Sequence, residues 1–445
     1  MQGARSLTRS IGIAAALAAA AAVTFAASDA EAAVVDRSFG EAGFAIAGDP
    51  VSGERTRAAT LDAKSRIVTV ASSHGQLQLT RLLPDGDPDP SFGVQGIAEV
   101  GFGTQDARAD DIVSDGSAIL TAGFSGFEGG DQDSYYRFQV TRLSPDGQLD
   151  AGFGDGGVAI ASRLSYGIAY AIARDSRGRI WAAGRTSRNY GGPPDLAIAR
   201  FTPQGQLDRG FADDGIWRKD LERGANRSPE EIDDIAIDGR GRLLFAATRG
   251  PSSESSGHML VGRLLPGGEL DRSFGDRGLR RVFVLDRHRY SRAAAIAIDR
   301  RGRAVVTGSA QNYRGQNEFA VARLDPDGSL DHSFSGDGLR QLGQYKADAT
   351  DIDVLGGNRL LVSGRSDGYG HTPQMTAVAL THKGALDRSF GRGGRFVARF
   401  GFSSRSVDAL AGQPGRLLLA GDTEQRTPAG DSSQLDVGVI ALKRR

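Results

Sequence analysis

Short runs of alternating apolar and polar residues follow one another along the chain, and each run ends at a turn signal. The clearest set covers Ala295 to Asp299, Arg303 to Gly308 and Phe319 to Leu324. Asp-x-x-Gly and Pro-Asp-Gly segments separate these runs. A period of two interrupted by such turns predicts antiparallel strands joined by tight hairpins. After residue 33 no run keeps a helical period over about eleven residues, so the pattern predicts an all-β protein.

The same set of runs returns at a nearly constant spacing, marked by an Asp-x-x-Phe core. The core aspartates are Asp36, Asp89, Asp150, Asp208, Asp271, Asp331 and Asp387. In the fifth unit we expect a fourth strand to start near Asp331. Four strands in about 58 residues are typical of one propeller blade. Residues 34–445 are therefore predicted to form a seven-bladed β-propeller of four-stranded antiparallel blades.

The two ends of the chain complement each other. The repeat region begins with an Asp-x-x-Phe strand from Val34 to about Ala47 and ends with a third strand from Leu435 to Leu442. The first unit therefore supplies the fourth strand that the last unit lacks. We expect the N-terminal strand to complete the seventh blade, which closes the ring and pairs edges that would otherwise be exposed.

The repeated unit resembles a known family. Arg-Leu-x-Pro-Asp-Gly-x-Leu-Asp-x-Ser-Phe-Gly-x-x-Gly, seen at Arg142 to Gly157 and Arg323 to Gly338, is similar to the delta-60 repeat of exported bacterial proteins. The resemblance covers all seven units and implies a propeller-like fold and export. It implies no activity and no active-site residue.

The first 33 residues have the pattern of a signal peptide. Arg5 and Arg9 precede an almost wholly apolar run from Ile11 to Ala27, and Ala30 to Ala32 provides small residues for cleavage. We expect cleavage after about Ala32 and an exported, periplasmic or secreted mature protein. An uncleaved membrane anchor is the alternative.

Charge and composition narrow the classes of partner. The chain has 54 basic and 54 acidic residues, so no net field draws it to nucleic acid. It has no cysteine, which excludes disulfides and thiolate chemistry. Its 6 histidines show no metal-ligand spacing, and neither a nucleophile elbow nor a phosphate loop occurs. No cofactor and no metal are predicted.

The repeated Asp and Phe are interpreted as structural, because a residue that occurs once per blade serves the blade. We expect each Phe to pack between neighbouring blades and each Asp to accept backbone N–H bonds in the next turn. Asp325, Asp327 and Asp331 have part of a calcium-loop spacing, against which an ordinary Asp-Gly turn is the simpler interpretation.

The connections after the second and fourth strand of each unit vary in length, and in an up-and-down blade both emerge on one face. Variable loops on a rigid scaffold usually carry function. All nine tyrosines of the chain map to this face. The predicted ligand-binding residues are Tyr135, Tyr136, Tyr190, Tyr313, Tyr369, Tyr290, Tyr345, Arg185 and Arg314.

Tyrosine combines an apolar ring with a hydrogen-bonding hydroxyl, which suits stacking on sugars or anchoring peptides. We therefore expect a non-enzymatic binding or scaffolding propeller that recognises a glycan, a peptide or an envelope protein. Two alternatives stay open, a polysaccharide hydrolase or lyase and a purely structural surface protein. The enzyme would need converging carboxylates, for which the candidates are Glu128, Asp131, Asp133, Glu230, Glu231 and Asp367.

Overall fold

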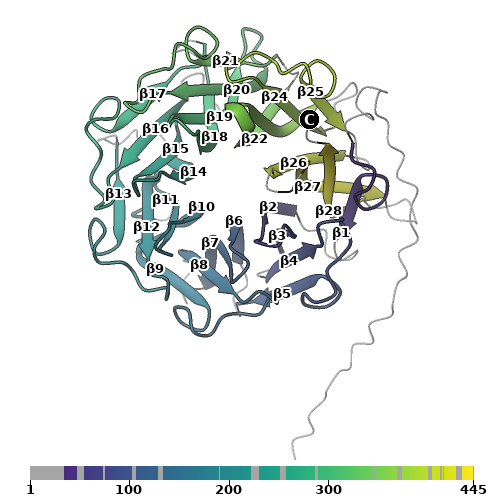
Figure 1. Cartoon of the computed structure of the whole chain (residues 1–445). Coiled ribbons are helices and arrows are strands. Elements are labelled where there is room, and N and C mark those ends of the chain that lie inside the picture. The colour runs from purple at the N-terminus through teal and green to yellow at the C-terminus, as the bar shows by residue number, and fades with distance from the viewer. Residues whose placement is uncertain are drawn as a thin grey trace, which may run out of the picture.

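Seven four-stranded antiparallel sheets are arranged as blades around a central axis (Figure 1). The computed structural model describes residues 35–47, 55–73, 76–102, 107–128, 134–189, 191–221, 230–250, 257–285, 289–343, 346–367, 373–398, 403–410, 413, 415–426 and 433–443. The predicted seven-bladed propeller is confirmed. The predicted signal peptide lies outside the described residues.

Each blade runs from an innermost strand beside the axis to an outermost strand at the rim. Blades 1 and 2 contain β2 (Arg55–Leu61), β3 (Ile67–Ser73), β4 (Gln76–Leu82) and β5 (Ile97–Gly101), then β6 (Ala107–Ser114), β7 (Ile119–Glu128), β8 (Ser134–Leu143) and β9 (Val158–Ser165). Blades 3 and 4 contain β10 (Ile168–Arg174), β11 (Ile180–Thr186), β12 (Asp195–Phe201) and β13 (Ile216–Lys219), then β14 (Glu230–Ile237), β15 (Leu243–Arg249), β16 (His258–Leu264) and β17 (Leu279–Val282).

Blades 5 and 6 contain β18 (Ser291–Ile298), β19 (Ala304–Gln311), β20 (Asn317–Leu324) and β21 (Leu339–Gln341), then β22 (Ala347–Val354), β23 (Leu360–Asp367), β24 (Pro373–Leu380) and β25 (Arg395–Ala398). A short 3-10 turn, η1 (Gly356–Asn358), joins β22 to β23. Blade 7 contains β26 (Ser403–Leu410), β27 (Arg416–Arg426), β28 (Ser433–Lys443) and β1 (Phe44–Ala47).

Both ends of the chain build the seventh blade, as predicted. β1 pairs antiparallel with β28, with Phe44 opposite Ile440 and Ala47 opposite Val437. A further bridge joins Val35 to Leu442. The ring is therefore closed by backbone hydrogen bonds between the two ends of the described chain.

The motif phenylalanines fill the space between blades. Phe334 of the fifth blade is fully buried and packs with Ile352 and Val378 of the sixth. A side chain added at Gly384 in the sixth blade would meet the Phe334 ring at 2.9 Å. The backbone there must approach this closely, which is why a glycine occupies the turn.

In each of the first five blades an arginine of the third strand connects the motif to the next blade. Arg323 donates from Nε to Asp331 Oδ2 (2.7 Å) and from Nη1 to the His382 carbonyl of the next blade (2.6 Å). Its guanidinium lies 4.6 Å from the centroid of the Phe334 ring. The corresponding arginines, which bind their own motif aspartate and a proline carbonyl of the following blade, are Arg81, Arg142, Arg200 and Arg263.

The motif aspartates hold their own turns as expected. Asp331 Oδ1 accepts hydrogen bonds from the amide (2.9 Å) and the hydroxyl (2.6 Å) of Ser333. Burial alone would raise the pKa of Asp331, but the bonds from Ser333 and Arg323 outweigh it and hold that pKa at about 2. Asp331 is one of the three aspartates with part of a calcium-loop spacing, and its carboxylate is bound within the blade by these contacts.

One sequence expectation about the blade is wrong. The fourth strand of the fifth blade starts at Leu339 and not near Asp331. The intervening segment turns back on itself, with Ser335 at φ 57° and Gly338 at φ 84°. Such left-handed backbone interrupts a strand. Within the described part of the chain, no helix is long and apolar enough to span a bilayer.

Candidate functional site

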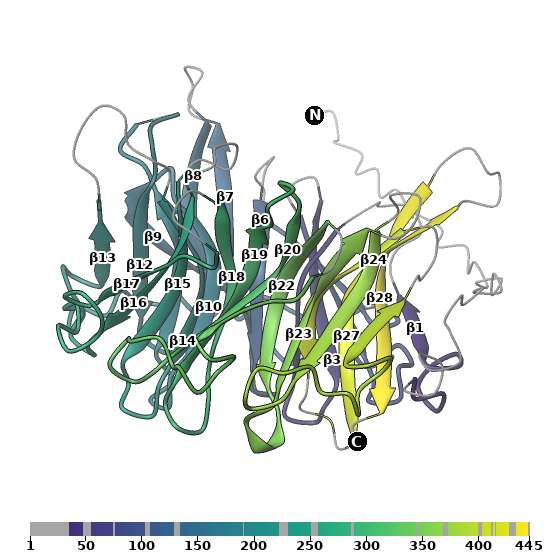
Figure 2. The same ribbon diagram turned by 90° about the horizontal axis from the view of Figure 1, so that it is seen from above.

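The two ends of the propeller differ in their connections (Figure 2). One end carries the tight turns between the first and second strands, such as the turn in which Gly302 N donates to the Asp299 carbonyl (2.9 Å), and the uniform motif connections between the third and fourth strands, such as residues 325–338. The opposite end, here called the long-loop face, carries the connections after the second and fourth strands, whose length varies from blade to blade. The predicted site residues that the structure describes at this face are Tyr135, Tyr136, Tyr290, Tyr313, Arg185 and Arg314.

The predicted tyrosines lie in different environments. Tyr136 packs edge-on against Phe124, with ring centroids 4.6 Å apart. Tyr290 is buried and only 7 % exposed, whereas Tyr313 is 73 % exposed. Tyr190, Tyr345, Tyr369 and the side chain of Tyr135 lie outside the described residues.

Tyr313 stands on an ordered turn. Asn312 Oδ1 accepts the backbone amides of Arg314 (2.8 Å) and Gln316 (3.1 Å), and the Gly315 amide donates to the Asn312 carbonyl (3.0 Å). Arg289 donates to the same carbonyl (2.9 Å), and its guanidinium lies 5.0 Å from the centroid of the Tyr313 ring. This arrangement, the Tyr313 platform, presents an aromatic ring to solvent on a loop fixed before any ligand binds.

The innermost strands form a second polar region along the axis. In each of them a β-bulge shifts the register by one residue, for example between Ala109 and Asp111 in β6. The residues just after the bulge, in blade order, are Ala58, Asp111, Ala171, Asp234, Ala295, Asp351 and Asp408. We call the four aspartates the carboxylate ring. All four residues are partly exposed.

Carboxylates of the ring join neighbouring blades. Asp111 accepts the Ile112 amide of its own strand and the Ile172 amide of the next blade, both at 2.7 Å. Asp234 in the same way accepts the Ile296 amide of the fifth blade (2.7 Å). Asp408 accepts the Ala59 amide of the first blade, across the closure of the ring.

Three of the ring carboxylates are costly to ionise. Burial, supported by the charges of Asp351 and Asp110 and opposed by its two amide bonds, raises the pKa of Asp111 to about 7. Burial, followed by repulsion from Asp111, also raises the pKa of Asp234 well above its usual range. Burial, followed by repulsion from Asp351 and Asp111, raises the pKa of Asp408 in the same direction. Asp111 lies in the second blade and Asp351 in the sixth, so the carboxylates act on one another across the axis.

Above the ring, towards the long-loop face, blades 2 to 4 bring five polar residues together. We call them the mouth cluster, and they are Arg108, Asp110, Tyr170, Arg185 and Glu231. Arg108 pairs with Asp110 (2.9 Å), and Arg185 of the third blade pairs with Glu231 of the fourth (3.3 Å). The Arg185 guanidinium lies 5.6 Å from the centroid of the Tyr170 ring.

Electrostatics join the members of the mouth cluster. Burial raises the pKa of the Tyr170 phenol well above its usual range, and the Glu231 charge adds to the rise. Burial also raises the pKa of Asp110, although the Arg108 charge opposes it. Arg185, one of the predicted residues, therefore belongs to a charged group at the start of the inner strands.

The carboxylates proposed for the enzyme alternative are placed as follows. Glu230 is buried and accepts the Leu221 amide (3.1 Å), with Arg249 at 3.3 Å. Glu231 is paired in the mouth cluster, and Asp367 is partly buried at the end of β23. Asp131, Asp133 and the side chain of Glu128 lie outside the described residues. In the part of the chain that the structure describes, no three His, Asp or Glu side chains are grouped to hold a metal ion.

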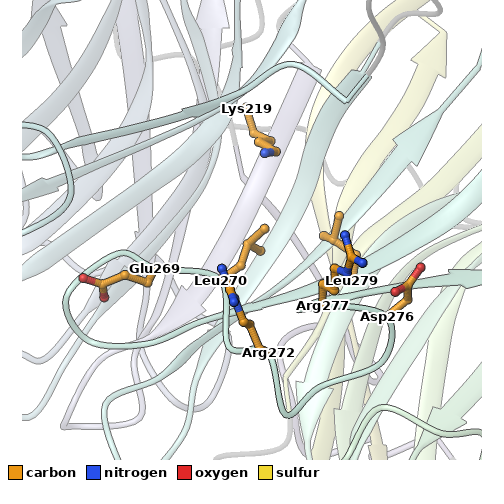
Figure 3. Close-up of a pocket in the computed structure, with 7 residues that line it drawn as sticks. All are labelled: Lys219, Glu269, Leu270, Arg272, Asp276, Arg277 and Leu279. Carbon is orange, nitrogen blue, oxygen red and sulfur yellow. The ribbon is translucent and has the colours of Figure 1, made fainter.

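A groove on the outer wall is formed by residues of the repeated motif. It lies between Lys219 of β13 and the motif turn of the fourth blade, where Glu269, Arg272 and Asp276 line it (Figure 3). The turn is the Asp-Arg-Ser-Phe-Gly segment that recurs around the ring. This groove therefore does not single out one blade as a functional site.

Sequence reasoning pointed to the long-loop face but missed the carboxylate ring and most of the mouth cluster. A bulge moves a side chain from one face of a strand to the other, and strict alternation cannot show it. A signal was present in four repeats, where an Asp recurs at one position of the first strand, at Asp111, Asp234, Asp351 and Asp408.

Comparisons with known proteins agree with the fold. Residues 127–153, 178–211 and 302–334 match the model of a β-propeller family described as a domain of unknown function, DUF5122. Each match ends at or next to a motif phenylalanine, Phe153, Phe211 or Phe334. A comparison with curated proteins gives no match.

Solved structures of similar shape are distant in sequence. They include a protein of unknown function from Dyadobacter fermentans, with 13 % identity over 90 % of this chain and 98 % of that one at a TM-score of 0.46. Virginiamycin B lyase from Staphylococcus aureus has 12 % identity over 90 % and 99 % of the two chains at 0.45. An ulvan lyase of polysaccharide lyase family PL25 has 9 % over 90 % and 93 % at 0.49. We draw no functional argument from these likenesses.

Proposed function

We propose that the protein is an exported, non-enzymatic binding or scaffolding propeller that recognises a glycan, a peptide or another protein through its long-loop face. The Tyr313 platform is the observation that carries this proposal. Tyr313 is 73 % exposed and so available for contact, and its supporting turn is already ordered. Binding to such a ring loses little conformational entropy, which favours recognition.

The arginines of this face support the same function. Arg289 lies against the Tyr313 ring, and Arg314 is exposed on the same turn. Tyrosine and arginine are the residues most often found at the centre of binding surfaces, because both combine apolar contact with hydrogen-bond donors. Tyr313 and Arg314 share one ordered turn of a rigid scaffold, and Arg289 reaches that turn from the connection before β18, an arrangement that suits a recognition site.

The test is binding of the purified protein to immobilised envelope polysaccharides, and to envelope proteins in parallel, with product analysis on every ligand that binds. We expect Tyr313→Ala to weaken binding at least tenfold, since stacking and anchoring aromatics dominate such contacts. Val94→Ala is the matched control, because Val94 is 65 % exposed but belongs to the motif turn of the first blade. Equal loss in both variants, or no binding by the parent, would refute the proposal, and products released from a bound glycan would favour the enzyme alternative.

A further inference from the structure

The mouth cluster contains a phenol that packing does not explain. Tyr170 is the residue inserted at the bulge of β10, where pairing skips from Ala169 to Ala171. Bulges re-aim side chains, and here the ring of the inserted residue lies beside Arg185 of the neighbouring strand. Among the described residues no group forms a hydrogen bond with the Tyr170 hydroxyl. The bulge positions of the other six blades carry arginine, aspartate, alanine, threonine or valine, so the phenol distinguishes the third blade.

The surrounding ion pairs are open to solvent. The side chains of Arg185 and Glu231 are 35 % and 36 % exposed, and the side chain of Arg108 is 27 % exposed. Arginine only donates hydrogen bonds, a carboxylate only accepts them, and a phenol does both. The cluster thus places hydrogen-bond donors, hydrogen-bond acceptors and a hydroxyl that can do both side by side.

The charges of the mouth cluster restrict the class of ligand that can bind there. A strongly anionic ligand would meet Glu231 and Asp110, with the carboxylate ring below them. A strongly cationic ligand would meet Arg108 and Arg185, and the charge of Arg57 also reaches Asp110. A ligand without net charge that carries many hydroxyl groups satisfies both signs, because each hydroxyl both donates and accepts.

We propose that the mouth cluster binds a neutral carbohydrate, with the Tyr170 hydroxyl and the Arg185–Glu231 pair as its hydrogen-bonding partners. This inference rests on the proposed binding function and adds a ligand class and a second place of contact. The sugar lies where the inner strands of blades 2 to 4 begin, and the Tyr313 platform, in the fifth blade, contacts a separate part of the ligand or another ligand.

The experiment titrates the full chain with neutral gluco-, manno-, galacto- and xylo-oligosaccharides, with oligogalacturonates and with chitosan oligomers, by calorimetry. We expect one neutral series to bind. Tyr170→Phe should weaken that binding about tenfold, because it removes one hydrogen bond and nothing else. Thermal unfolding of this variant should be unchanged, since the hydroxyl has no partner among the described residues.

Val94→Ala is the control, since Val94 is exposed but lies in the motif turn of the first blade, outside both the mouth cluster and the Tyr313 platform, and it should leave the Kd for the neutral sugar within twofold. Glu231→Gln removes one acceptor and should also weaken binding. Binding of charged oligosaccharides only, or Tyr170→Phe with unchanged affinity, would overturn this inference while the proposed function stands. If the parent binds proteins but no sugar, this inference also fails and the proposed function stands. If the parent binds neither sugars nor proteins, both the inference and the proposed function are refuted.

Discussion

The carboxylate ring should make the propeller less stable as the pH rises through neutrality. A carboxyl whose pKa is higher in the folded chain than in the unfolded chain takes up a proton on folding at intermediate pH. Its contribution is therefore favourable at low pH and disappears above the folded-state pKa. For Asp111 the window extends from the ordinary value of 3.8 to about 7.

The size of the effect follows from the same two values. A rise from 3.8 to about 7 corresponds to about 4 kcal/mol between the limits of the window. Between pH 8 and pH 5 about 2.5 kcal/mol of this appears, and the partial exposure of Asp111 makes that figure an upper limit. Asp234 and Asp408 change in the same direction, so these two carboxylates add to the dependence on pH.

The assay is urea unfolding at pH 8, 7, 6 and 5, followed by tyrosine and tryptophan fluorescence. The parent should become more stable as the pH falls, and Asp111→Ala should show a smaller change, although alanine at this place is tolerated in the first, third and fifth blades. The control is Asp337→Ala, an exposed aspartate that follows Phe334 in the fifth blade and lies outside the ring. If the parent is equally stable at pH 8 and pH 5, or if Asp111→Ala keeps the full dependence, the ring does not titrate as argued.

Three further results are expected. Arg323→Met should lower the free energy of unfolding by about 3 kcal/mol, as measured by chemical denaturation. The variant leaves the buried Asp331 with one cation fewer and removes the hydrogen bond to the next blade. A loss below about 1 kcal/mol would contradict this role of Arg323. Below pH 4 stability should fall, because Asp36 and Asp89 have folded-state pKa values of about 2 and lose their stabilising charge as the pH drops from about 4 to 2; acid titration by circular dichroism measures this, and a flat curve would refute it. Removal of β1 should leave β28 as an open edge and cause association, visible by light scattering; a monomer of parental stability would show that the closure is dispensable.

The blade was predictable because its signals are local and repeated. Asp299 to Arg303 reads as a hairpin turn, and Phe334 reads as a packing residue because its equivalents recur at the same place in every unit. The closure by β1 followed from the two complementary ends. The start of the fourth strand was misplaced because positive φ at Ser335 is set by the close approach of the sixth blade and not by a residue preference.

The contacts of the mouth cluster were harder to predict. Tyr170 was assigned to the correct face, but its contacts depend on a bulge and on residues of two other blades. Arg185 was predicted as a loop residue, whereas it forms an ion pair with Glu231 across a blade boundary. Such neighbours are more than forty residues apart in the sequence. Their proximity follows from the ring geometry, which local patterns do not contain.

The pairing of β1 with β28 also sets an order of events during synthesis. A strand made at the start of the chain has its partner among the last residues to be made, with Phe44 opposite Ile440. The first six blades contain only consecutive strands and can assemble as the chain emerges. The seventh cannot, so β1 has no strand partner until β28 has been synthesised. The ring therefore closes only after the strands of all seven blades have been made.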